Sequence, residues 1–75
     1  MPHIEIKCFP GRIEEQKALL ANKLAEDAAE ILGSKIKNIS VVIQDVPKER
    51  WRTDVYEAQV KPNENCLYKE SEFKG

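Results

Sequence analysis

The stretch HIEIKCF, residues 3–9, decides the fold, because its polar and apolar residues alternate. A period of two is typical of a half-buried β-strand. We therefore expect the apolar side chains of Ile4, Ile6 and Cys8 to face the core. The Pro10-Gly11 pair ends this strand, since proline cannot donate to a sheet ladder and glycine accepts turn dihedrals.

The next segment, from about Arg12 to Leu32, changes to a helical period. Its apolar stripe is made of Ile13, Leu20, Leu24, Ala28 and Ile31. Alanine, leucine, glutamate and lysine dominate the segment, and all four residue types are good helix formers. Gly33 is placed to cap the end. The pattern predicts one long helix with an apolar stripe.

A second strand is predicted at Ile39–Val46, which is rich in β-branched residues and is followed by Pro47. A strand, a helix and another strand make a βαβ unit, in which the two strands are parallel and the crossover is right-handed. The sequence therefore predicts an α/β fold.

The last third of the chain has a less regular pattern. Val55–Val60 fits either a short strand or an irregular helical piece, and Pro62 is suited to start a short helix. Residues 71–75 are expected to be frayed. We interpret residues 1–75 as one domain, with residues 61–75 as a C-terminal extension.

Self-association is expected, because a two-stranded βαβ unit leaves sheet edges and apolar surface uncovered. A chain of 75 residues is also marginal as a monomer, since it buries only about 60% of its unfolded surface. We expect a homodimer with a four-stranded sheet and two helices on one face, in preference to a hexamer.

Composition excludes several classes of partner. Twelve Lys and Arg against thirteen Asp and Glu give a net charge of −1 without a clustered basic face, so no nucleic-acid partner is expected. The chain has neither an apolar run of about 20 residues nor the regions of a signal peptide. We therefore expect no membrane partner and a cytoplasmic location. Cys8 and Cys66 read as reduced thiols, and with a single histidine no clustered metal site is expected.

Pro2 is the remaining candidate for chemistry. Removal of Met1 would give it a free secondary amine, which can accept a proton. A working base must be unprotonated, and both an apolar environment and a nearby guanidinium disfavour the ammonium form. Arg12 is the candidate for the guanidinium, and Trp51 is the candidate for the apolar surface. The residues alone also allow a plain turn proline, a solvated arginine at a helix start and a tryptophan used only for packing.

Taken together, these features resemble the 4-oxalocrotonate tautomerase family, whose short βαβ chains have the tautomerase/MIF-like fold and a catalytic amino-terminal proline. The segment GRIEEQK, residues 11–17, is similar to the G-R-x-x-E-Q-K signature of that family. The resemblance runs from Pro2 to about Trp51. It implies that Pro2 is the base, that Arg12 binds a substrate carboxylate and that Trp51 is the aromatic wall beside the proline.

One position departs from the hexameric members of the family, which carry a second substrate-binding arginine where this chain has Ser40. That departure points to the PptA-like subgroup, whose members are dimers with a longer C-terminal segment. The resemblance to this subgroup lies in the opening PHIEIKCFP, in the Ser34-Lys35 and Ile39-Ser40 pairs, and in the pattern from Tyr56 to Pro62.

The resemblance implies an isomerase, a tautomerase that interconverts the keto and enol forms of small 2-oxo acids without a cofactor. With one arginine, Ser40 in place of the second and a tryptophan wall, an aromatic or apolar monocarboxylate is the expected substrate. The candidates for the group that polarises the carbonyl oxygen are backbone donors, His3, Ser40 and a basic residue near Arg50. The alternatives are a non-catalytic dimeric interaction module and a dehalogenase or decarboxylase of the same superfamily.

Overall fold

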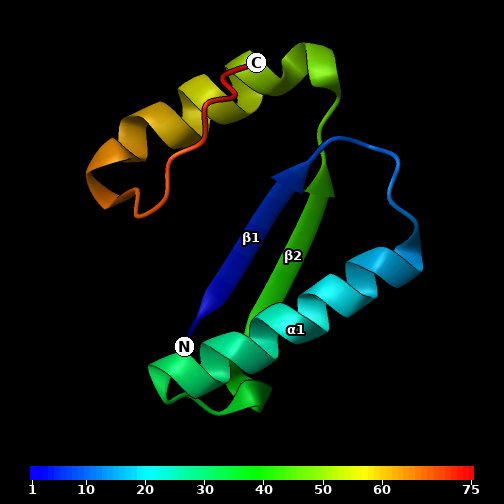
Figure 1. Cartoon of the computed structure of the whole chain (residues 1–75), viewed down its shortest axis with the longest axis vertical. Coiled ribbons are helices and arrows are strands. Elements are labelled where there is room, and N and C mark those ends of the chain that lie inside the picture. Colours follow the sequence, from blue (N-terminus) through cyan, green and yellow to red (C-terminus); the bar gives the residue numbers. More distant parts are fainter.

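The computed structural model describes residues 1–75. Strand β1 (His3–Cys8) and strand β2 (Ser40–Asp45) pair in parallel, and helix α1 (Glu14–Leu32) forms the crossover between them (Figure 1). The predicted α/β fold with a βαβ unit is therefore confirmed. None of the helices is both long enough and apolar enough to cross a bilayer.

The two faces of this small sheet differ in character. Ile4 lies opposite Val41 and Ile6 opposite Ile43, and all four side chains are half-buried. The same face carries Asp45, which α1 contacts through Lys17, so this is the face that the helix covers. The other face is mainly polar, and its paired side chains hydrogen-bond across the strands, including Lys7 Nζ to Gln44 Oε1 at 2.8 Å.

Helix α1 begins at Glu14, two residues later than predicted, and ends where predicted. Its first turn is closed by Gln16, whose Oε1 accepts a hydrogen bond from the Ile13 N–H at 3.0 Å. This bond satisfies one of the amide groups that a helix start leaves without a partner. At the other end Gly33 has φ +70°, the left-handed conformation that glycine adopts at helix C-caps.

The sheet covers only part of the apolar stripe of α1 in the protomer. Leu24 and Ala28 are half-buried, but Ile13 is 60% exposed and Ile31 is 81% exposed. Two strands are too narrow to cover a full helix face, so only the middle of the stripe lies on them. In the whole protomer only Val46 and Val55 are buried.

An ion pair holds α1 against the end of β2. Lys17 Nζ donates to Asp45 Oδ2 at 3.0 Å, and the Lys17 side chain is largely covered. The hydrogen bond from Lys17 to Asp45 raises the pKa of the lysine. The nearby carboxylate stabilises the charged form of the lysine. The ion pair therefore joins the first turns of α1 to the last residue of β2.

The C-terminal third is helical rather than extended. A 3₁₀ turn η2 (Lys48–Arg50) leads into a wide helix η3 (Arg52–Val60) with π-type hydrogen bonding, followed by η4 (Lys61–Cys66), which has Pro62 in its first turn as expected. The tail, residues 67–75, turns back along η3 (Figure 1). Residues 71–75 form no helix or strand and are exposed, and the backbone oxygen of Gly75 accepts a hydrogen bond from Arg52 Nη2 at 3.3 Å.

We predict that Asp54 makes stability depend on pH in the acid range. Arg50 donates two hydrogen bonds to Asp54, at 2.8 and 3.2 Å, and this contact lowers the pKa of the carboxyl. The stabilisation is therefore present above the unfolded-state pKa of about 3.9 and is lost as pH falls through the lower folded-state pKa. Asp54→Asn should lower the melting temperature at pH 7 and flatten its decline below about pH 4.

Circular dichroism melts between pH 2 and pH 7 measure this dependence. Asp27→Asn, which removes an exposed carboxylate without an ion pair on α1, is the matched control. An acid limb as steep in Asp54→Asn as in the unsubstituted chain would contradict the assignment.

Candidate active site

Pro2 and Ser40 lie together at the N-terminal ends of the two strands. Pro2 is half-buried, and its carbonyl accepts a hydrogen bond from the Ser40 N–H at 3.3 Å. His3 joins them, since its Nδ1 lies 2.6 Å from Ser40 Oγ. The Ser40 hydroxyl is thus engaged with a neighbouring histidine. We call Met1, Pro2, His3 and Ser40 the proline edge.

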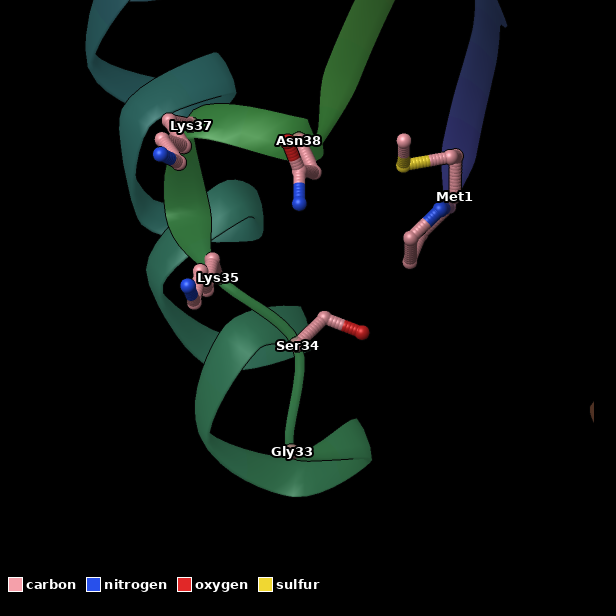
Figure 2. A pocket seen from close by; sticks show the side chains of 7 residues that line it. Met1, Gly33, Ser34, Lys35, Lys37 and Asn38 are labelled. Atoms are coloured by element: carbon pink, nitrogen blue, oxygen red, sulfur yellow. The ribbon is translucent and has the colours of Figure 1, made fainter.

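A cavity of about 480 Å³ opens beside Pro2. Its other walls are Met1, the Gly33–Lys35 segment after α1, and Lys37 and Asn38 of the 3₁₀ turn η1 (Ile36–Asn38). Figure 2 shows the Ser34 oxygen directed toward the Met1 side and the Asn38 amide nitrogen directed into the space. The cavity therefore combines the proline with uncharged polar groups and two lysines.

Sequence reasoning gave Ser34, Lys35, Lys37 and Asn38 no part in the site. A signal was available, because a parallel βαβ unit brings the residues before its second strand beside the start of its first. The connection from Gly33 to β2 had to pass next to Pro2 for this reason.

Arg12 and Trp51 lie together at the opposite ends of the strands. Arg12 is exposed and forms no ion pair, and its Nη1 donates to the Phe9 carbonyl at 3.1 Å. The Phe9 ring contacts Trp51 edge to face, with ring centroids 5.0 Å apart and planes at 80°. An unpaired guanidinium thus stands beside an aromatic cluster.

Phe73 from the tail completes that cluster. Its ring centroid lies 5.6 Å from Phe9 and 6.2 Å from Trp51. Phe9 and Phe73 were missed as site candidates, the first because it ends a strand and the second because residues 71–75 were expected to be frayed. We call Phe9, Arg12, Trp51 and Phe73 the arginine edge.

A single protomer does not bring the four predicted residues together. Pro2 and Ser40 precede or begin the strands, whereas Arg12 and Trp51 follow them, and a six-residue strand spans about 20 Å. Figure 1 shows the N-terminus at one end of β1 and the C-terminal layer at the other. The protomer therefore carries two separate halves of the predicted site. No group of three or more His, Cys, Asp or Glu side chains is placed to hold a metal ion.

Comparison with known proteins decides the family. The family model described as Tautomerase enzyme matches residues 2–56, which begin at Pro2 and include Arg12, Ser40 and Trp51. The chain belongs to the tautomerase family. Tautomerase PptA of Shigella sonnei (strain Ss046) is 39% identical over 70 residues, which are 92% of this chain and 92% of that protein.

Two solved structures are also similar to this tautomerase. One is from the 4-oxalocrotonate tautomerase isozymes of Methylibium petroleiphilum, with 40% identity, a TM-score of 0.63, and coverage of 67% of this chain and 81% of that one. The other is a heterohexamer 4-oxalocrotonate tautomerase from Chloroflexus aurantiacus, with 33% identity, a TM-score of 0.66, and coverage of 72% and 87%. The predicted resemblance to 4-oxalocrotonate tautomerases of the PptA-like kind is confirmed, and this tautomerase is an isomerase.

Proposed function

We propose that this tautomerase interconverts the enol and keto forms of small 2-oxo monocarboxylates that bear an aromatic or apolar group. Pro2, freed by loss of Met1, serves as the base and then as the conjugate acid. The observation that carries the proposal is the position of Pro2, half-buried on the wall of the cavity of about 480 Å³. The assignment to a family of isomerases favours this activity over a non-catalytic interaction module.

Loss of Met1 changes the chemistry of the Pro2 nitrogen. In the peptide bond this nitrogen has no basic lone pair, whereas the free secondary amine has one. Met1 also lines the cavity, so its removal opens space next to the new amine (Figure 2). The positive charges of Lys35 and Lys37 on the same cavity disfavour the ammonium form, and partial burial acts in the same direction.

A second copy of the chain would complete the site. A twofold axis that pairs an edge strand with its own copy makes the two strands antiparallel, so the start of one lies beside the end of the other. The proline edge of one protomer then meets the arginine edge of its partner. The exposed apolar side chains of Ile13, Leu19, Ile31 and Leu32, with only two buried residues in the protomer, support such pairing.

We propose the homodimer as the working unit, because one twofold contact both extends the sheet and joins the two halves of the site. A hexamer is the alternative, and the relative from Chloroflexus aurantiacus is a heterohexamer. The hexameric members of the family have a second substrate-binding arginine. This chain has Ser40 at that position, and the Ser40 hydroxyl is engaged with His3.

In the proposed reaction, the Pro2 nitrogen takes the proton from the enol hydroxyl or from a carbon next to the carbonyl. The resulting ammonium returns one proton to the other terminus of the conjugated system, so the proton count balances and no cofactor is consumed. Arg12 binds the substrate carboxylate through charge-assisted hydrogen bonds and fixes the reacting carbon near the amine. Ser34 and Asn38 are the uncharged donors that the cavity offers to the carbonyl oxygen.

A superfamily dehalogenase or decarboxylase remains a weaker alternative, because those reactions need a carboxylate that directs water. The residues that line the Pro2 cavity are Met1, Pro2, Gly33, Ser34, Lys35, Lys37 and Asn38. None of them carries a carboxylate, so the cavity favours the tautomerase chemistry.

Replacement of Pro2 tests the base directly. Pro2→Ala should lower kcat/KM for ketonisation of an aryl enolpyruvate by about 10² to 10⁴, the range expected for general acid and base catalysis. Intact mass must first show that Met1 is absent from both proteins. Pro10→Ala, at the exposed proline of the β1–α1 loop, is the matched control. Unchanged ketonisation by Pro2→Ala would reject the proposed base.

Replacement of Arg12 tests carboxylate binding. Arg12→Ala should raise KM for an aryl enolpyruvate by about tenfold to a hundredfold, because a hydrogen bond to a charged group is lost. Arg12→Lys should recover part of this loss, since the charge returns without the bidentate geometry. Lys23→Ala, which removes an exposed cation from α1, is the control. A KM for Arg12→Ala equal to that of the control would contradict the role. Equal or better turnover of a dicarboxylate dienol by the unsubstituted chain would instead contradict the proposed preference for monocarboxylates.

A further inference from the structure

The tail, residues 67–75, is held against η3 at its far end. The backbone oxygen of Gly75 accepts a hydrogen bond from Arg52, and Lys74 Nζ lies 5.9 Å from the centre of the Tyr56 ring. Gly75 has φ +105°, and a Cβ built on it would lie 2.8 Å from the Arg52 nitrogen. The end of the tail therefore contacts η3, while residues 67–75 all stay exposed to solvent.

A second cavity, of about 410 Å³, lies between the tail and the helices η3 and η4. One part of its lining is apolar and made of Trp51, Tyr56, Val60, Leu67 and Phe73, and the rest is polar or charged, made of Lys61, Glu64, Lys69, Glu70, Ser71 and Lys74. The volume falls in the range of about 300 to 1,000 Å³ that is typical of small-molecule sites. Trp51 and Phe73 both belong to this wall and to the aromatic cluster beside Arg12.

The aromatic cluster connects this cavity to Arg12. The carbonyl of Phe9 accepts the hydrogen bond from Arg12, and the ring of Phe9 contacts both Trp51 and Phe73. Part of the cluster is accessible to solvent, because Trp51 is only half-buried and Phe73 is 48% exposed. A molecule with a carboxylate at Arg12 would therefore present its remaining part to aromatic surface.

We propose that the cavity under the tail binds the apolar group of the substrate and that Phe73 is a specificity-determining residue. This inference rests on the proposed function, in which Arg12 holds the substrate carboxylate. Phe73 acts by contact with the aromatic group of the ligand and by keeping the Trp51 ring in place. The tail thus selects aryl-substituted acids over small aliphatic ones.

Binding of trans-cinnamate and crotonate tests this proposal, because the two acids share an unsaturated carboxylate and differ in a phenyl or a methyl group. Trp51 is the only tryptophan of the chain, so its emission reports on the cluster, and calorimetry gives both dissociation constants. The unsubstituted chain should bind cinnamate about tenfold more tightly than crotonate. Phe73→Ala should weaken cinnamate about fivefold through loss of the aromatic contact, and leave crotonate within about twofold.

Two further variants make the result specific. Phe73→Leu, which keeps an apolar side chain, should fall between the alanine variant and the unsubstituted chain, and it decides the question if circular dichroism shows that Phe73→Ala is unfolded. Tyr68→Ala is the matched control, because Tyr68 lies in the same tail and is fully exposed. Its cinnamate affinity should be unchanged.

The proposal is overturned if Phe73 substitution weakens both acids equally or neither of them, or if the unsubstituted chain does not prefer cinnamate. These outcomes are separate from a failure of the proposed function, because binding needs no proton transfer. If Pro2→Ala retained full ketonisation activity, the proposed base would be rejected, but the cinnamate and crotonate titrations would still test the role of Phe73.

Discussion

The parallel pairing of β1 with β2 is the constraint on which the rest of the structure depends. Because both strands run in the same direction, the segments that precede them gather at one end of the sheet and the segments that follow them gather at the other. Pro2 and the residues before β2 meet at the first end, whereas Arg12 and Trp51 meet at the second. The backbone topology therefore separates the proposed base from the proposed substrate anchor.

The same topology leaves the protomer incomplete as a folded unit. Two strands do not cover α1, so Ile13 and Ile31 stay exposed, and only Val46 and Val55 are buried. Antiparallel addition of a second copy to a sheet edge would cover apolar surface and would also bring a proline edge to an arginine edge. In this account, association stabilises the fold and assembles the site in one step.

Features set by local sequence were predictable, and features set by distant contacts were not. The alternation in residues 3–9 gave β1, and Gly33 marked the end of α1, because pleat and cap depend on neighbouring residues. The exposure of Ile31 depends on the width of the sheet, which no local pattern records. The packing of Phe73 on Phe9 joins residues at opposite ends of the chain, so an irregular tail gave no sign of it. Pro2, Arg12, Ser40 and Trp51 could be proposed as site residues from the sequence, but their division between two edges became visible only in the fold.

The central claim is that Pro2 and Arg12 act in one site but come from different chains. The most direct test is to mix the variants Pro2→Ala and Arg12→Ala in equal amounts, unfold and refold them together, and measure kcat/KM for ketonisation of an aryl enolpyruvate, which each substitution alone lowers. Half of the dimers would then be mixed, each with one intact site, so the account predicts recovery of about a quarter of the unsubstituted activity. Activity no greater than the average of the two separate variants, in a mixture shown by native mass spectrometry to contain mixed dimers, would contradict it.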